Sequence, residues 1–402
     1  MNRVVISGIG VLSSIGKNTP EFWGALKQGR VGVGPIQTAD CSSLRFRNGA
    51  EVTNYDAAHY FERREAECMD RFAQFAVIAA REAVGDAGLE WTPALRSCAA
   101  VITGACVGGQ SSEDQGFVDL YRLNRNRVHP LTIPRTMANA GASHISMQLG
   151  ITGPGFTIST ACASSAHALG VAYWMVRSGA VPLAIAGGSE APFSVGILKA
   201  WEALRVVSTT TCRPFSRDRD GMVLGEGAAM LVLEPLEAAQ ARSARVYGEI
   251  VGFGMSCDAS HLTQPSAEGA ALAMSRALCD AKLDSHHIGY INAHGTGTDL
   301  NDPAEAAAIR QVFGAHTDRL AVSSTKSMHG HALGAAAALE AAAAVLSLHY
   351  GVLPPTANFT EPDPACNLDV VPNQSRLADI EYCLSNSFAF GGLNATLAFR
   401  RM

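Results

Sequence analysis

Apolar segments of strand type and of helix type alternate along the whole 402-residue chain, and this alternation predicts an α/β architecture. Strands are predicted at 3–8, 99–104, 183–186, 246–255, 289–294 and 320–323, and helices at 69–87, 134–149, 267–281, 303–313 and 334–348. Segments 382–387 and 395–400 are predicted to close the chain as an antiparallel pair. The other strands are expected to be parallel and covered by helices on both faces.

The order of these elements is similar in two parts of the chain, which predicts two α/β halves at 1–244 and 245–402. The sequences of the halves are not visibly alike, so this internal repeat rests on the pattern alone. Segment 332–348 is apolar but short for a membrane span, and Glu340 interrupts it. It is predicted to be a buried helix.

Cys162 lies between two elements of different type. Segment 155–159 is apolar and β-prone and is predicted to be a buried strand, whereas 165–179 has helical spacing and ends at a glycine. A thiol at such a turn is close to a helix N-terminus, where backbone N–H groups and the helix dipole are expected to lower its pKa. The alternative is a small buried hydrophobe, which is the commonest role of a free cysteine.

Two histidines and a lysine follow predicted strands in the second half of the chain. His294 comes directly after a strand and is followed by two glycines, which places it at the sheet edge where ligands bind. A turn histidine is the alternative. Lys326 and His331 lie between a short strand and an Ala-rich helix, although a lysine is most often a solvated surface residue. His329 and His331 form an H-x-H, but without a third ligand at fixed spacing zinc is not expected.

Phe390-Gly391-Gly392 forms a last cluster, close to the C-terminus. Two glycines allow the backbone to approach a ligand and to point N–H groups at it, although they also suit a tight hairpin turn. A thiol nucleophile, imidazoles that polarise or exchange protons, and backbone donors for an oxyanion together predict acyl transfer.

Composition excludes several other functions. The net charge is −5 and no basic run occurs, which argues against a nucleic-acid partner. The ten cysteines include no C-x-x-C, so neither a zinc ribbon nor a redox dithiol is indicated. The N-terminus leads directly into a strand without a signal peptide, and a reduced, cytoplasmic protein without membrane insertion is expected.

Taken together, the motifs resemble the β-ketoacyl-acyl carrier protein synthases over essentially the whole chain. The resemblance rests on Thr160-Ala161-Cys162, on 294–298 (His-Gly-Thr-Gly-Thr), on Thr325-Lys326-Ser327 and on Gly330-His331. Histidine at 331, where the initiating type has asparagine, makes the chain resemble the elongating KAS II type. The resemblance implies a thiolase-like fold, in which two α/β halves form a five-layered α-β-α-β-α core. It implies no metal and no tightly held cofactor.

The reaction that this resemblance implies is a decarboxylative Claisen condensation. Cys162 accepts an acyl group, and His294 and His331 bind the thioester oxygen of malonyl-acyl carrier protein while CO₂ leaves. The backbone amides of Cys162 and Phe390 form the oxyanion hole. Lys326 organises the site and pairs with Glu340.

Further positions match residues that bind substrate in the family. These are Thr296 and Thr298 at the phosphopantetheine arm, Phe390 as a mobile gate, and Phe388, Val107 and Trp201 at the substrate or acyl pocket. Trp201 stands where phenylalanine is commoner in housekeeping enzymes. This departure favours a specialised synthase, for example of nodulation or polyene type.

Acyl carrier protein is the implied partner, and Arg125, Arg127, Lys199 and Arg205 are basic residues that could dock it. A homodimer through 155–162 is also implied. Two alternatives remain. A non-condensing, chain-length-determining subunit has the same fold but usually lacks the nucleophile, whereas a thiolase has a Cys-x-Gly turn where this chain has Phe390-Gly391-Gly392.

Overall fold

The computed structural model describes all residues from 1 to 402. The longer strands are β1 (Val4–Ser13), β4 (Ala100–Gly104), β5 (Gly155–Ile158), β6 (Ala184–Glu190), β7 (Gly227–Pro235), β8 (Gly248–Cys257), β9 (Ile288–Asn292), β10 (Ala321–Ser323), β14 (Tyr382–Ala389) and β15 (Leu393–Arg400). Two-residue strands are β2 (Gly34–Pro35), β3 (Asn48–Gly49), β11 (Val352–Leu353), β12 (Asp369–Val370) and β13 (Arg376–Leu377). The longer helices are α1 (Thr19–Gln28), α3 (Arg71–Ala87), α5 (Gln110–Phe117), α7 (Ala140–Leu149), α8 (Ser164–Ser178), α9 (Val195–Leu204), α11 (Ala267–Ala281), α12 (Asn301–Phe313) and α14 (Ala336–Tyr350). The short ones are α2 (Arg63–Glu67), α4 (Pro93–Cys98), α6 (Thr132–Thr136), α10 (Leu236–Ala241) and α13 (Lys326–His329).

Eleven strands form one continuous sheet in the order β12-β10-β9-β14-β15-β8-β1-β7-β6-β4-β5. The expectation of parallel strands is correct only for its two ends, β12-β10-β9-β14 and β6-β4-β5. All pairings between β14 and β6 are antiparallel. β7 was not expected from the sequence, because its fully buried residues show neither alternation nor a β-branched composition.

The two parts of the sheet have the same strand order. If the strands of the first part are numbered one to five along the chain, their order across the sheet is 3-2-4-5-1, which is β5-β4-β6-β7-β1. In the second part, β10-β9-β14-β15-β8 follows the same order, with β12 added outside β10. The repeat that was predicted from pattern alone is therefore present in the topology. The parts join where β1 pairs with β8.

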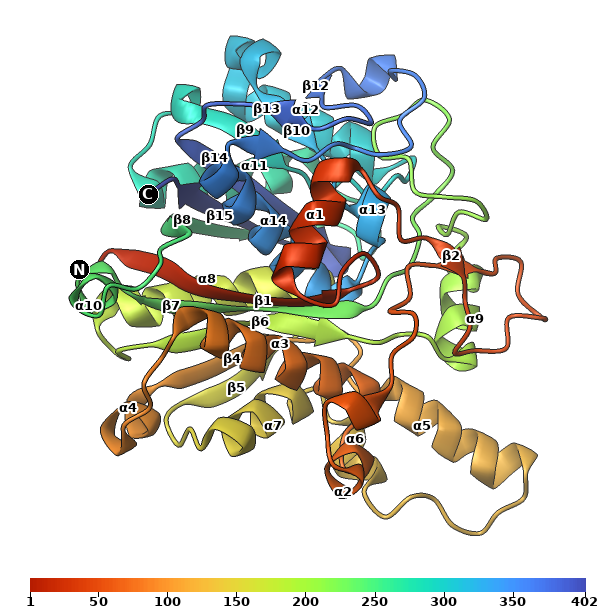
Figure 1. The fold of residues 1–402 in the computed structure, drawn as a ribbon. Helices are drawn as coiled ribbons and strands as arrows, with labels where there is room; N and C mark the ends of the chain where they lie inside the picture. Colours follow the sequence, from red (N-terminus) through yellow and green to blue (C-terminus); the bar gives the residue numbers. More distant parts are fainter.

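Helices cover both parts of the sheet and also separate them (Figure 1). α3 and α7 pack on the outer face of the first part, and α11 and α12 on the outer face of the second. α8 and α14 contact each other and lie between the two parts. The result is the expected order of five layers, helix, sheet, helix, sheet, helix.

α14 is the central helix predicted at 334–348. The 18-residue segment Leu333–Tyr350 is long and apolar enough to cross a membrane by length and composition, but 89% of it is buried inside the protein. Most of its alanines and leucines belong to the largest hydrophobic cluster of the fold. α14 is therefore a core helix, as expected.

β5 differs from its prediction as a buried strand. It is the last strand of the sheet, and its two first residues, Gly155 and Phe156, are exposed. An apolar strand at a free edge has the composition of a buried one, so the sequence could not separate the two cases. β5 leads directly to Cys162.

The helix predicted at 134–149 is also wrong in part, because it is divided into α6 and α7. Met137 is extended, with φ −60° and ψ 129°. The carbonyl oxygen of Thr136 accepts a hydrogen bond from the backbone N–H of Gly109, 3.2 Å away. A distant loop thus takes the acceptor that would have continued the helix.

Candidate active site

Cys162 lies in the turn between β5 and α8, two residues before the helix begins. The preceding residue, Ala161, has a φ of +47°, a conformation that is unfavourable for a residue with a Cβ. Ser164 holds the turn, because its Oγ accepts from the N–H of Thr160 (2.9 Å) and donates to the carbonyl of Ala161 (2.6 Å). The strained backbone of Ala161 thus places the Cys162 thiol at this turn.

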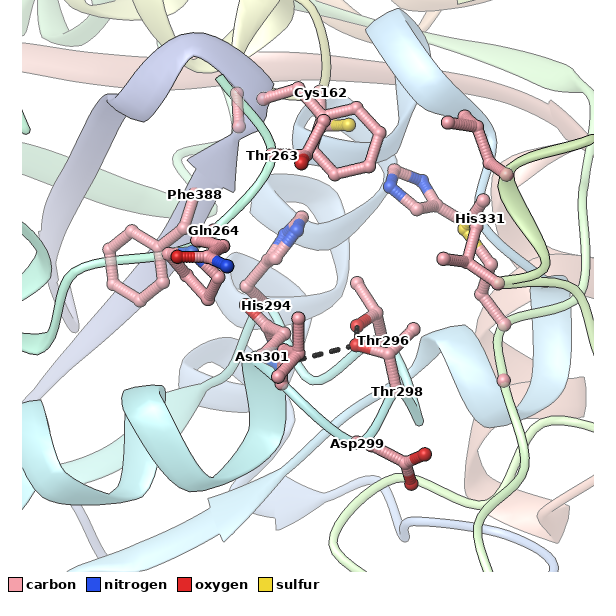
Figure 2. A pocket seen from close by; sticks show the side chains of 18 of the residues that line it. Cys162, Thr263, Gln264, His294, Thr296, Thr298, Asp299, Asn301, His331 and Phe388 are labelled. Atoms are coloured by element: carbon pink, nitrogen blue, oxygen red, sulfur yellow. Dashed lines mark hydrogen bonds between the residues drawn. The ribbon is translucent and has the colours of Figure 1, made fainter. Parts of the chain in front are cut away.

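Cys162 opens onto a cavity of about 350 Å³. His294, His331, Thr296, Thr298, Phe388, Phe390 and Trp201 also line it. Figure 2 shows the two imidazole rings and the sulfur facing the same space, although the residues come from distant segments. Most of the residues predicted for the site are therefore brought together.

The imidazole of His294 is held by a lysine. Nζ of Lys326 lies 3.1 Å from Nδ1 of His294 and donates to its carbonyl oxygen at 2.7 Å. An ammonium group only donates, so Nδ1 is the acceptor and the proton of the neutral ring is on Nε2. Burial, the charge of Lys326 and His331 hold the pKa of His294 well below its usual value.

The ring of His331 is in the same protonation state for a different reason. Its Nδ1 accepts a hydrogen bond of 3.1 Å from the backbone N–H of Leu333. Burial, Lys326 and His329 hold its pKa well below the usual value. The centroids of the His294 and His331 rings are 5.4 Å apart and their planes are nearly perpendicular, at 87°. Two neutral Nε2–H donors therefore serve one cavity.

Lys326 forms a completely buried ion pair with Glu340 of α14, a pairing that the family resemblance implied. Burial raises the pKa of Glu340 to about 7, while the charge of Lys326 opposes that shift. Removal of either partner would leave a buried charge uncompensated, which costs about 3–5 kcal/mol. The pair fixes the ammonium group against His294.

The expectation of a lowered pKa for Cys162 is wrong. Burial raises the pKa of its thiol to about 11, although the charge of Lys326 and the backbone N–H groups of Phe390 and of Cys162 itself pull it down. The helix end thus does not outweigh the loss of water around the sulfur. The resting residue is a thiol.

Alkylation of Cys162 should therefore accelerate with pH. Because the pKa is about 11, the thiolate fraction and the rate of reaction with iodoacetamide should rise about tenfold per pH unit between pH 7 and 9. Mass spectrometry of the peptide that carries Cys162 measures this rate separately from the other cysteines. A rate that levels off below pH 8 would show that the free enzyme holds a stabilised thiolate.

The Phe390 loop lines the cavity. Gly391 and Gly392 have φ values of +84° and +70°, and a Cβ on Gly392 would meet Asp258 at 2.5 Å. The ring of Phe390 stacks on Trp201, with centroids 6.1 Å apart and planes at 26°. The backbone N–H of Phe390 thus reaches the sulfur of Cys162, while the Phe390 side chain contacts Trp201.

Other predicted residues occupy distinct places. Thr296 and Thr298 lie together on the cavity wall, with their hydroxyl oxygens 2.9 Å apart. The ring of Phe388 is 6.1 Å from that of His294. Val107 is not among the lining residues; it packs in an adjoining apolar cluster with Trp201 and Phe193. Its role in the acyl pocket stays a prediction.

Sequence reasoning missed the carboxylates behind the His294 loop. Glu305 accepts the backbone N–H groups of His294 (2.8 Å) and Gly295 (2.7 Å), and Asp302 accepts that of Gly297 (3.1 Å). The available signal was their spacing of three on the helix that follows the loop, which places both on one face. They hold the loop in shape.

The two domains of the β-ketoacyl synthase family match this chain, the N-terminal domain at residues 1–239 and the C-terminal domain at 247–360. A Nodulation protein E from a Rhizobium species is 46% identical over 400 residues, covering 100% of this chain and 99% of that protein. A 3-oxoacyl-[acyl-carrier-protein] synthase 2 from a Synechocystis species is 42% identical over 408 residues, covering 99% and 98%.

Solved structures of ketosynthases have the same fold as this chain. The ishigamide ketosynthase/chain length factor has a TM-score of 0.96 at 36% identity, covering 100% of this chain and 99% of that chain. A type II polyketide ketosynthase in complex with its acyl-carrier protein has a TM-score of 0.89 at 30% identity, with the same coverage. The expected thiolase-like fold is confirmed by these neighbours, and the chain belongs to the β-ketoacyl synthase family.

Proposed function

We propose that Cys162, His294 and His331 carry out the decarboxylative condensation of an acyl group with malonyl-acyl carrier protein, giving 3-oxoacyl-carrier protein and CO₂. The observation that carries this assignment is that the thiol and two neutral imidazole donors open onto one cavity. The 3-oxoacyl-[acyl-carrier-protein] synthase 2 relatives support the elongating KAS II type of activity, and the assignment of steps to residues is our proposal.

In the first step, the sulfur of Cys162 attacks the carbonyl carbon of an acyl-carrier thioester. The N–H groups of Cys162 and Phe390, which already lower the pKa of the thiol, are the donors for the oxyanion. The carrier thiolate leaves, the thiol proton ends on it, and the acyl group stays on Cys162. Attack needs the thiolate, so only the small fraction of enzyme molecules with an ionised Cys162 reacts with the acyl-carrier.

In the second step, malonyl-carrier enters and the Nε2–H groups of His294 and His331 donate to its thioester oxygen. The carbon–carbon bond to the carboxylate breaks, CO₂ leaves, and the electron pair moves into an enolate that these donors stabilise. The enolate carbon then attacks the acyl-cysteine, a carbon–carbon bond forms, and the sulfur of Cys162 leaves. Neutral rings suit this step because they stabilise the enolate without protonating its carbon.

The substrate contacts follow from the cavity wall. We assign the phosphopantetheine arm to Thr296 and Thr298, and the passage to the acyl pocket to Phe388 and Phe390. The acyl chain itself would lie beside Trp201 and Val107, which share one apolar cluster. The 46% identity to a Nodulation protein E supports a specialised chain preference.

Acyl carrier protein is the partner, and Arg205 is the basic residue best placed to dock it. Arg205 lines the cavity beside the exposed Leu204. Lys199 and Arg125 are already paired with Glu202 and Asp119.

A homodimer through β5 is part of this proposal. Large exposed apolar side chains concentrate between 117 and 156, at Phe117, Tyr121, Leu123, Val128, Ile133, Met137, Met147 and Phe156. Exposed apolar side chains, with Phe156 on the unpaired strand edge itself, are typical of a protein interface. A chain length factor partner, named in the ishigamide structure, is the alternative occupant.

We also propose that the chain divides at 244/245 into two halves, one carrying Cys162 and the other both histidines and Lys326. The shared strand order supports this division. Ten free cysteines fit a reducing compartment, and the cytoplasm is the location we propose.

Mass-tagged acyl-carrier thioesters test the function directly. Incubation should leave the acyl mass on the Cys162 peptide, and addition of malonyl-carrier should release CO₂ and form 3-oxoacyl-carrier. No adduct on Cys162 would favour a non-condensing subunit. An adduct without CO₂ release from malonyl-carrier would favour a thiolase.

A further inference from the structure

Glu190, the last residue of β6, is a buried carboxylate that the mechanism above does not use. Its exposed fraction is 0%, and no lysine, arginine or histidine forms an ion pair with it. Burial raises its pKa to about 7, against the effect of several backbone N–H groups. A carboxylate without a counter-charge is costly to bury, so its hydrogen bonds must serve a purpose.

Four backbone N–H groups donate to Glu190. Oε2 accepts from Cys106 (2.7 Å) and Gly334 (3.1 Å), while Oε1 accepts from Val107 (3.2 Å) and Gly108 (3.0 Å). The first loop, 106–108, follows β4, and the second belongs to the short helical turn Leu333–Ala335. One carboxylate thus joins two loops that are more than 220 residues apart in sequence.

Both loops contribute to the apolar cluster that contains Trp201, and the second loop also holds His331. Val107 packs in the apolar cluster that contains Trp201. On the other side, the residue before Gly334 is Leu333, whose N–H binds Nδ1 of His331 and so fixes its tautomer. Leu333 has a φ of +48°, a strained value that neighbouring contacts must maintain. The loops are tightly joined, because a Cβ on Gly334 would meet the N atom of Cys106 at 2.4 Å.

We propose that Glu190 is a positioning residue, which clamps the acyl-pocket loop 106–108 to the turn that aims His331. The inference rests on the proposed function. An ionised carboxylate has two acceptor oxygens for the four N–H groups, and charge strengthens each bond. An amide in its place has one acceptor oxygen, so its NH₂ group faces either the N–H groups of Cys106 and Gly334 or those of Val107 and Gly108, and two of the four hydrogen bonds are lost.

Glu190→Gln tests the clamp because it preserves size and burial. The kcat for CO₂ release from malonyl-carrier should fall about tenfold, the effect of a lost hydrogen bond to a charged group, because His331 is no longer aimed. The KM for long acyl-carriers should rise more than that for short ones, because loop 106–108 loosens. Activities are normalised to the folded, thiol-titrated enzyme.

Two further variants separate positioning from stability. Glu234→Gln removes a buried carboxylate at the far end of β7, where it binds Ser7 and Arg242, and should leave both kinetic constants unchanged per folded molecule. Gly334→Ala pushes the two loops apart at the same contact and should reproduce the chain-length dependence of Glu190→Gln. It also serves as the test if Glu190→Gln does not fold.

Kinetic constants that stay at wild-type values per folded Glu190→Gln molecule would overturn the clamp. The clamp would also be overturned if Glu190→Gln lost activity equally with all acyl-chain lengths and in CO₂ release, and if Glu234→Gln showed the same loss. Glu190 would then have only a structural role. Both outcomes leave the proposed function intact, because that function fails only if the wild-type enzyme neither loads an acyl group nor releases CO₂.

Discussion

Replacement of Cys162 by glutamine should abolish condensation while CO₂ release from malonyl-carrier continues. The variant has no sulfur to receive an acyl group, so no 3-oxoacyl product can form. The amide oxygen of the glutamine resembles the thioester carbonyl oxygen of an acyl-cysteine. It can accept hydrogen bonds from the backbone N–H groups of residue 162 and Phe390, which otherwise surround the sulfur. The malonyl site, built from His294 and His331, therefore stays in its working form.

Trapping of labelled CO₂ and mass spectrometry of the carrier measure the two outcomes of this variant separately. Cys162→Ala is the matched control, because it removes the sulfur without supplying an amide and should decarboxylate more slowly than Cys162→Gln. A Cys162→Gln enzyme that releases no CO₂ would show that acylation and decarboxylation cannot be divided between these residues.

Loss of the second imidazole should have a similarly large effect. His331→Ala is expected to lower decarboxylation by about a hundredfold or more, because one of two positioned donors to the enolate oxygen is lost. Acylation of Cys162 should be affected much less, since the N–H donors of the first step lie at Cys162 and Phe390. Initial rates of CO₂ release and of acyl loading, measured on the same preparation, give this comparison.

His331→Asn is the informative partner of that variant. Asparagine can still accept the N–H of Leu333 through Oδ1 while its Nδ2 donates into the cavity. It should recover a substantial part of the lost CO₂ release. Near wild-type release by His331→Ala would remove this residue from the mechanism.

Much of the fold could be predicted because helix and strand periods are strong in this chain. The helix at 267–281 is correct to the residue, and α3 begins two residues later than expected. The antiparallel pairing of β14 with β15 was predicted correctly. β7 was missed and the direction of β1 relative to β8 was wrong, because buried strands carry no directional signal. The edge position of β5 depends on long-range pairing, which no local pattern contains.

The candidate site was predictable in its residues but not in its electrostatics. Cys162, His294 and His331 were found from their positions after strands and from the family resemblance. The raised pKa of Cys162 was not, since it depends on how deeply three distant segments bury the sulfur. The tautomer of His331 depends on the backbone of Leu333, and the hydrogen bonds of Glu190 join loops whose meeting is visible only in three dimensions.

The position of β5 at the border of the sheet has a consequence for how such an enzyme can change. The strand that leads into the Cys162 turn has a free row of backbone groups on one side, so a second polypeptide that pairs there becomes a wall behind the reactive sulfur. Substitutions in that second polypeptide could then alter the chemistry in trans. Selectivity could evolve in this way without a single mutation in the gene that encodes the thiol.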